Sequence, residues 1–523
     1  MANGNKPHLE IVIDRSEFFR WQQHVIEVVT ASPDVVATIV AAPEAPPTLP
    51  GLDLLFAFER VFVGADRDTA VDRVAPPEST AAATPDLILD LTGRLPPQTR
   101  APVLRATCLG LPPLVGAIVA VLDDRSPTLE FERVEPSGEV RHATCWRVGV
   151  EDRHNTLLAV SQILGRLAHG VLVALDEHVR DAERGGDPGV RAERRAAPNG
   201  AASLRLLTRA VASRVLRRLE RRLREPPDWR VIWRRRDPAT APLAPETDPT
   251  PFRLLPDDGR RFYADPFVVS EAGRTWLFVE EFPYATGRGV LSLAEIAPDE
   301  AIGTPRPFLE QGCHLSYPQI FAEAGTFWMI PETSGRRTVE LWRAVAFPDR
   351  WERHAVLLED VDVGDATVVR RDGRWWMFGC RRERWCSSWD ALDVWQAPSL
   401  AGPWTPIARS PAKVDVASAR PAGAMIETAA GLMRPVQDSS RGYGCGLALA
   451  RVDRLDETGF AETILQRFVT PPPLHGLHTW NRAATPNGLV EVMDIFARAR
   501  DFGASRRLDL GGRPSTGVGF SKT

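Results

Sequence analysis

The sequence predicts a multidomain chain, with an N-terminal Rossmann-like α/β domain followed by an all-β, five-bladed β-propeller. Short apolar runs alternate with helical stretches as far as residue 183, which favours βαβ units. From residue 229 to 515, a pattern of short strands recurs about every 50 residues. The length of 523 residues also exceeds the ~150 residues of one ordinary domain.

The predicted α/β domain covers residues 1–183. Residues 18–29 carry apolar side chains at helical spacing, and a second, longer helix is expected over 154–183. Two alternating runs joined by Pro136-Ser137-Gly138 predict a β-hairpin over 128–148. The apolar runs that predict the remaining strands are 9–13, 35–41, 60–64 and 86–91.

Residues 184–228 are predicted to link the two domains. A loop rich in glycine, proline and charge precedes an expected amphipathic helix over 201–224, with leucine and valine on one face and arginine on the rest. One interpretation is peripheral contact with an anionic membrane surface. The other is an interdomain helix whose arginine face is solvated.

The propeller prediction depends on five similar segments, each with a small or polar start, an apolar strand, a glycine turn and a second strand. Their equivalent positions are Pro266, Pro318, Ala366, Pro421 and Asn481, at spacings of 52, 48, 55 and 60 residues. Repeats of this length with several strands are typical of propeller blades. Residues 229–236 are expected to supply a strand that closes the ring.

The innermost strands of a propeller converge on a central funnel, so side chains at their starts face one another. Carboxylates bind sugar hydroxyls or transfer protons, aromatic rings stack on sugar rings, and arginine binds acidic substituents. The catalytic candidates are Asp265, Asp365 and Glu332. The substrate-binding candidates are Glu281, Ser316, Tyr317, Arg420, Arg434, Asp438, His478 and Trp480.

Composition excludes several other classes of function. A formal net charge of −4 argues against a nucleic-acid partner. The six cysteines have no CxxC spacing, and His314 and His478 lack a spaced set of partners, so no metal or other cofactor is expected. The sequence shows neither a signal peptide nor a run of ~20 apolar residues. We therefore expect a cytoplasmic location, with membrane-peripheral contact as the alternative.

The segments ADPF, HLSYPQIF, MIPETS and RPVQDSSRGYG resemble the N-terminal domain of the glucosamine inositolphosphorylceramide transferases. That domain belongs to the five-bladed superfamily of furanosidase-type glycoside hydrolases. The resemblance covers residues 260–500 and implies a carbohydrate-related propeller. Hydrolases of the superfamily place a general-base Asp in blade one, a pKa-modulating Asp in blade three and a general-acid Glu in blade four. Asp265 and Asp365 match the first two, whereas the fourth blade starts with Arg420.

The run from residue 86 to 124 is similar to the formyltransferase-like fold, in the order strand, loop, helix, strand and Leu-Pro segment. Active members carry an Asn and a His in this stretch. The matching stretch Cys108–Pro113 has neither, so the resemblance implies a degenerate relative in which formyl transfer is not expected.

Three functions follow as hypotheses. In the first, the propeller binds or processes a glycan or glycolipid head group in glycan or cell-surface polysaccharide biosynthesis. In the second, the chain is a glycoside hydrolase with Asp265 as base, Glu332 as acid and Asp365 as the tuning carboxylate. In the third, the chain is a non-catalytic glycan-binding or interaction protein.

Overall fold

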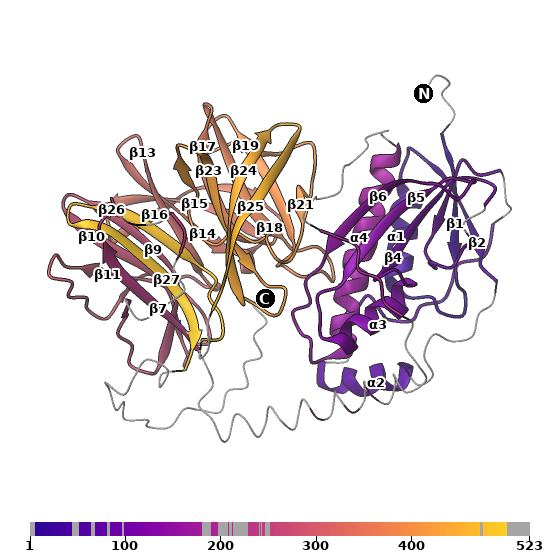
Figure 1. The fold of residues 1–523 in the computed structure, drawn as a ribbon, viewed down its shortest axis with the longest axis horizontal. Helices are drawn as coiled ribbons and strands as arrows, with labels where there is room; N and C mark the ends of the chain where they lie inside the picture. The colour runs from indigo at the N-terminus through magenta and orange to yellow at the C-terminus, as the bar shows by residue number, and fades with distance from the viewer. Residues whose placement is uncertain are drawn as a thin grey trace. The chain divides into compact units, whose positions relative to one another are not determined.

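The computed structural model describes residues 6–43, 52–63, 68–80, 84–96, 99–179, 190–196, 228–239, 243–245, 252–470 and 474–498, with a few single positions between them. The chain divides into two compact units (Figure 1). One unit comprises Met1–Arg222 with Glu383–Ser387, and the other comprises Leu223–Arg382 with Ser388–Thr523. The basic helix predicted over 201–224 lies, but for three single positions, outside the described residues.

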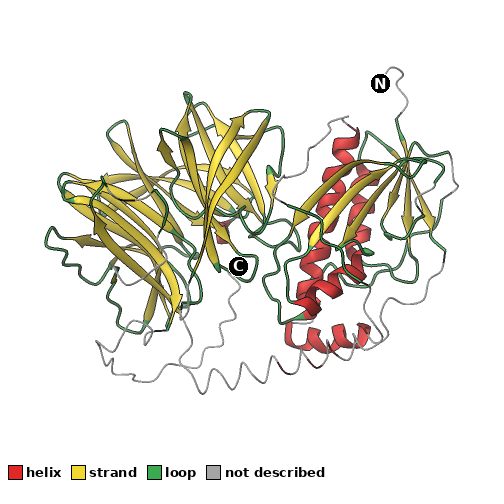
Figure 2. Ribbon diagram, in the orientation of Figure 1, coloured by secondary structure: helices red, strands yellow, loops and turns green. Residues whose placement is uncertain are grey.

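The first unit is built on one six-stranded mixed sheet in the order β2-β1-β3-β4-β5-β6. Strands β2, β1, β3 and β4 are parallel, whereas β5 and β6 add an antiparallel hairpin where the turn sequence predicted one. Figure 2 shows the helices of this unit in red. The strands are β1 (His8–Ile13), β2 (Val36–Ala41), β3 (Leu87–Asp90), β4 (Val103–Cys108), β5 (Thr128–Val134) and β6 (Val140–Arg147). The helices are α1 (Arg20–Ala31), α2 (Leu52–Val63), α3 (Pro113–Asp123) and α4 (Thr156–Val179).

Helix α4 is the core helix of this unit. Leu157, Val160 and Leu164 are fully buried, and Gly170 lets the helix approach the sheet, because a Cβ there would lie 2.1 Å from the Phe131 ring. Among the described residues, this is the one helix long and apolar enough to cross a membrane, and 67% of that stretch is buried inside the protein. Such extensive burial is typical of a helix in the core of a globular unit.

Two local predictions in this unit are wrong. Residues 60–64 were expected to form a strand, but Arg60–Val63 end helix α2, whose buried Leu52, Leu55 and Phe56 have helical spacing. A short apolar run does not by itself distinguish a buried strand from a helix. The helix expected between β3 and β4 is absent from the described part of that stretch. Asp90 instead accepts hydrogen bonds from the N–H groups of Thr92, Gly93 and Leu95, which stabilises a loop.

The second unit is a five-bladed propeller, as the repeats predict. Its sheets are β9–β12, β13–β16, β17–β20 with β21 paired to β19, β22–β25, and β26-β27-β7-β8. The last sheet combines both ends of the domain, because β7 (Asp228–Arg236) pairs antiparallel with β27 (Gly488–Ala497). The predicted closing strand is therefore confirmed, and the closed ring leaves no wide gap between the first and last blades.

Four strands make each blade, from the propeller axis outward. The innermost strands are β9 (Arg261–Glu271), β13 (Ser316–Glu323), β17 (Val363–Arg371), β22 (Ile426–Thr428) and β26 (Trp480–Thr485). The second strands are β10 (Arg274–Pro283), β14 (Thr326–Thr333), β18 (Arg374–Arg381), β23 (Gly431–Asp438) and β27. The third are β11 (Val290–Ile296), β15 (Thr338–Ala346), β19 (Ala391–Ala397), β24 (Gly446–Asp456) and β7. The outer strands are β12 (Arg306–Leu309), β16 (Arg350–Glu359), β20 (Thr405–Pro406) with β21 (Lys413–Val414), β25 (Gly459–Val469) and β8 (Arg253–Leu254).

Apolar clusters between neighbouring blades form the propeller core. One cluster joins Val231 and Trp233 of the closing blade to Leu277 and Val279 of the next. Because all sheets are antiparallel, the starts of the innermost strands and the ends of the second strands lie at the same edge. The candidate residues predicted from the strand starts therefore gather at one end of the propeller axis.

Candidate functional site

Three innermost strands begin with the same backbone irregularity. Asp265, Tyr317 and Asp365 have φ values of 49°, 46° and 54°, and the pairing register of each strand shifts at that point. Such left-handed residues in a bulge are uncommon and redirect a side chain out of the regular pleat. The bulges therefore present two carboxylates and one phenol from equivalent positions of three blades, and all three side chains are buried.

Tyr317 lies between the two aspartates. Its backbone N–H donates to Asp265 Oδ2 at 3.2 Å, and its hydroxyl lies 2.9 Å from Thr367 Oγ1 and accepts from the Gly423 N–H at 2.7 Å. Burial raises the pKa of Tyr317 well above its usual range, and the nearby charges of Asp365 and Asp265 add to the shift. The phenol therefore stays protonated and acts as a neutral hydrogen-bonding group.

Asp365 and Glu332 share one guanidinium group. Arg420 donates from Nε to Asp365 Oδ2 at 2.5 Å, and its Nη2 lies 3.5 Å from Glu332 Oε2. Gln437 donates a further hydrogen bond to Asp365 Oδ2 at 2.7 Å. Glu332 Oε2 also accepts from the Asp365 N–H at 3.1 Å. Since all of these side chains are buried, Arg420 is the cation that lets two carboxylates remain in the interior.

Asp265 belongs to a second buried network. Thr479 Oγ1 donates to Asp265 Oδ1 at 2.9 Å, and the Asp265 N–H donates to Asp494 Oδ2 at 2.9 Å. His478 lies between the two carboxylates, with Nε2 3.2 Å from Asp265 Oδ1 and Nδ1 2.7 Å from Asp494 Oδ1. Both ring nitrogens face carboxylate oxygens, so the His478 ring links Asp265 to Asp494 in one buried cluster.

The same three residues are the candidate metal ligands of the propeller. Asp265, His478 and Asp494 each offer a ligand atom, and these atoms lie within 4.8 Å of one another. The sequence prediction that His478 lacks ligand partners is therefore wrong for the folded chain. Its partners are Asp265 in blade one and Asp494 in β27. Sequence spacing missed them because Asp265 lies more than 200 residues away from His478.

Tyr443 is a site residue that the sequence did not single out. Its ring lies 5.1 Å from the His478 ring and 5.4 Å from the Trp389 ring, and the guanidinium carbon of Arg420 lies 5.4 Å from the Tyr443 centroid. Tyr443 therefore contacts both buried networks, while the residue as a whole is only partly buried. The sequence signal that includes Tyr443 is the RPVQDSSRGYG segment, which resembles the transferase family.

The remaining candidates are held by neighbours within their own blades. Glu281 pairs with Arg261 and accepts from Ser292 Oγ at 2.6 Å, and Ser316 is buried opposite Glu332 in the strand register. Three others are engaged away from the two networks. Arg434 binds Glu462 with two hydrogen bonds, Asp438 pairs with Arg467 at 3.2 Å, and Trp480 packs in an interblade apolar core.

The partly exposed groups at this end of the axis surround the buried centre. Asp362 lies just before β17, and its carboxylate is 3.5 Å from Arg382 Nε. Burial raises the pKa of Asp362, and the negative charge of Glu332 raises it further. Trp229, Phe262, Phe282, Tyr284 and Tyr443 pack in one aromatic cluster at the same edge. The arrangement combines aromatic faces with carboxylate acceptors and cationic donors, which are the groups that bind polyhydroxylated ligands.

Residues 257–492 match the family model described as "Glucosamine inositolphosphorylceramide transferase 1, N-terminal". The rice protein of that name (Oryza sativa subsp. japonica) is 30% identical over 252 residues, which cover 45% of this chain and 33% of the rice protein. The Arabidopsis thaliana protein is 28% identical over 224 residues, covering 42% of this chain and 29% of its own length. The chain thus spans about a third of these curated relatives, and its propeller resembles their N-terminal domain.

Solved glycoside hydrolases give a weaker likeness. A family 117 glycoside hydrolase of Zobellia galactanivorans aligns at 11% identity and a TM-score of 0.33, over 45% of this chain and 85% of the hydrolase. The exo-β-1,3-galactanase 1,3Gal43A of Clostridium thermocellum aligns at 13% identity and a TM-score of 0.32, over 39% and 49% of the two chains. The propeller assignment rests on the sheet order and ring closure, not on these scores.

Proposed function

We propose that the propeller binds a glycan or glycolipid head group at the end of its axis and serves glycan or cell-surface polysaccharide biosynthesis without hydrolysing its ligand. One observation carries the proposal: Arg420 occupies the start of the fourth blade and pairs with Asp365 and Glu332. Ligand hydroxyls would bind beside this network, and the half-buried ring of Tyr443 offers the aromatic face for a sugar ring.

The relatives support a role in glycolipid synthesis. They are named glucosamine inositolphosphorylceramide transferases, and the matching segment is their N-terminal domain. A domain similar to that segment is suited to recognising the sugar-bearing acceptor or product of such a transfer. We place this activity in the cytoplasm, in keeping with the expectation from the sequence.

The buried charges argue against hydrolysis. A general acid must carry a proton at the pH of the reaction, whereas a guanidinium group favours the ionised form of a neighbouring carboxyl. Glu332, the candidate acid, and Asp365, the candidate tuning carboxylate, both contact Arg420. Asp265 is likewise held by His478 and Thr479, which occupy the carboxylate that a hydrolase would use as its base.

The test compares glycan binding with release of reducing sugar for the full chain. The variants are Asp265→Asn, Asp365→Asn and Tyr443→Ala, with Asp372→Asn as a matched control, because the Asp372 side chain is 88% exposed at the tip of the β17–β18 hairpin. We expect wild type and the control to bind the same glycans on an array. The two aspartate variants should bind at least tenfold more weakly, Tyr443→Ala should bind roughly 2- to 12-fold more weakly, and no protein should release sugar.

Two results would overturn the proposal. Release of reducing sugar by the wild type and its loss in Asp265→Asn would identify a hydrolase. A wild type that binds no neutral, amino or acidic glycan on the array would identify an interaction protein. If an aspartate variant fails to fold, the partly exposed Tyr443→Ala keeps the test decisive.

A further inference from the structure

The first unit has a cavity at the topological switch point of its sheet. After β1 the chain crosses through α1 to β2 on one side, and then returns through α2 to β3 on the other side. Open α/β sheets bind ligands in the crevice beyond the carboxyl ends of two such neighbouring strands. The loops at this place are Asp14–Glu17 after β1 and Leu91–Arg94 after β3. The cavity therefore has the position of a ligand site.

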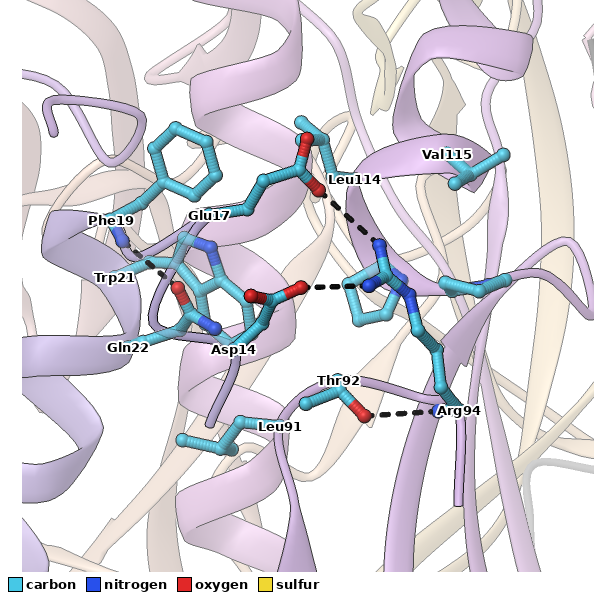
Figure 3. A pocket seen from close by; sticks show the side chains of 12 residues that line it. Asp14, Glu17, Phe19, Trp21, Gln22, Leu91, Thr92, Arg94, Leu114 and Val115 are labelled. Atoms are coloured by element: carbon cyan, nitrogen blue, oxygen red, sulfur yellow. Dashed lines mark hydrogen bonds and ion pairs between the residues drawn. The ribbon is translucent and has the colours of Figure 1, made fainter. Parts of the chain in front are cut away.

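Figure 3 shows the side chains that line this cavity. Phe19, Leu91 and Leu114 give it apolar walls, and Pro112 and Pro113 at the start of α3 close one side. Asp90 holds the β3 loop in place through its hydrogen bonds to Thr92 and Gly93. A cavity with apolar walls and a few polar groups on rigid loops is typical of small-molecule sites.

The polar groups of the cavity are two carboxylates around one guanidinium. Arg94 donates to Asp14 Oδ2 at 2.7 Å and to Glu17 Oε2 at 3.3 Å (Figure 3). The carboxylate side chains are 8% and 9% exposed, whereas that of Arg94 is 29% exposed. The negative charges thus form the floor of the site, and the positive charge lies across its opening. Burial alone would raise the pKa of Asp14, but hydrogen bonds from Ser16 and the charge of Arg94 lower it.

Trp21 supplies an independent indication of a ligand. Its side chain lines the same cavity and is 2% exposed, yet its Nε1–H has no hydrogen-bond acceptor among the described residues. A buried indole N–H normally finds a partner, because leaving a donor unpaired costs about 1–3 kcal/mol. An oxygen atom of a bound molecule would satisfy this donor.

We propose that this cavity is a binding site for a small hydroxylated amine, which displaces the Arg94 side chain. With Arg94 in place the cavity measures ≈ 30 Å³, whereas a single water needs about 10–15 Å³ on the same measure, so there is room for only two or three waters. Any larger ligand must therefore move Arg94. A neutral or anionic ligand that did so would take the charge of Arg94 away from the buried Asp14 carboxylate, which is strongly unfavourable. An ammonium group replaces the lost positive charge, and a hydroxyl oxygen accepts from Trp21 Nε1.

The test uses three probes of similar size and different charge: ethanolamine, ethylene glycol and glycolate. Binding to the full-length protein is measured by saturation-transfer NMR and by the shift in melting temperature. Of the three probes, we expect only ethanolamine to bind. Its affinity should be at least fivefold higher in Arg94→Ala, because the guanidinium that competes for the carboxylates is gone. Trp21→Phe should bind it several-fold more weakly. The control is Arg141→Ala, which removes a mainly exposed side chain that lies 3.6 Å from Glu135 in the β5–β6 hairpin of the same unit and should bind like wild type.

Equal binding of the three probes, or ethanolamine affinity that is the same in wild type, Arg94→Ala and Trp21→Phe, would overturn the proposal. Should Arg94→Ala unfold because its carboxylates lose their cation, ethanolamine must raise its melting temperature while ethylene glycol does not. If ethanolamine does not raise the melting temperature of Arg94→Ala, the proposal is also overturned. None of these readouts depends on glycan binding by the propeller.

Discussion

Arg420 Nε donates a hydrogen bond to Asp365 Oδ2 at 2.5 Å, across 55 residues of sequence and between the third and fourth blades. Both side chains are buried, at 3% and 1% exposure. This ion pair links the third and fourth blades at the end of the propeller axis where the candidate site lies. It also places a permanent cation near the start of the fourth blade.

The Arg420→Met variant should destabilise the propeller strongly. Removing the guanidinium leaves Asp365 and Glu332 as buried carboxylates without their cation, which costs about 3–5 kcal/mol. Urea unfolding of the full chain, followed by tryptophan fluorescence, measures the loss. The double variant Arg420→Met/Asp365→Asn should be less destabilised than the single one.

The matched control is Arg343→Met. Arg343 pairs with Glu352 on the surface, where both side chains are about half exposed, so its loss should cost less than about 1 kcal/mol. Equal destabilisation by Arg420→Met and Arg343→Met would show that the buried network contributes little.

Tyr443→Ala should weaken glycan binding, whereas Tyr443→Phe should not. The proposed contact uses the face of the ring, and aromatic contacts of this kind contribute about 0.5–1.5 kcal/mol, or roughly 2- to 12-fold in affinity. Calorimetric titration with a glycan selected on the array measures both variants. A Tyr443→Phe variant as weak as Tyr443→Ala would assign the effect to the hydroxyl and reject the stacking contact.

Glu462 should make the propeller acid-sensitive. Burial alone would raise its pKa, but the charges and hydrogen bonds of Arg434 and Lys413 outweigh burial and lower the pKa of Glu462 to about 2, from 4.5 in the unfolded chain. A depressed pKa in the folded state means that the stabilisation is complete above pH 4.5 and is lost as the pH falls toward 2. The shift corresponds to about 3 kcal/mol.

Urea unfolding at several pH values between 5 and 2 checks this prediction. The stability of the wild type should fall more steeply with acid than that of Glu462→Gln, which cannot take up that proton. Glu352→Gln, at an exposed ion pair, is the control and should follow the wild type. Parallel curves for wild type and Glu462→Gln would contradict the assignment.

Gly423→Ala should disrupt the contact between the fourth blade and the closing blade. Gly423 has φ of 136°, and a Cβ at this position would lie 2.1 Å from the Trp480 carbonyl oxygen. Backbone strain and the clash together should cost about 3 kcal/mol or more. Thermal unfolding measures the loss. Gly273→Ala is the control, since it shares a positive φ but has open space around it and should cost about 1 kcal/mol; equal losses would exclude the clash.

The sequence by itself determined the repeat, the blade count and the residues at the strand starts. Alternation fixes which side chains face the axis, and the turn residues fix where each strand ends, so Asp265, Tyr317 and Asp365 were identified without coordinates. In the first unit the same local signals identified β1, α1, the β5–β6 hairpin and α4. They misassigned residues 60–64, because the three consecutive apolar residues Val61–Val63 fit a strand and a helix equally well.

Only the tertiary structure decided the partners. Closure of the ring brings Asp494 and Asp265 to opposite sides of the His478 ring, and brings Tyr443 against both His478 and Arg420. No local pattern encodes these contacts, because they join residues that are distant in sequence through the packing of whole blades. The same holds for Arg94, Asp14 and Glu17, since neighbouring positions in a sheet follow strand order and not chain order.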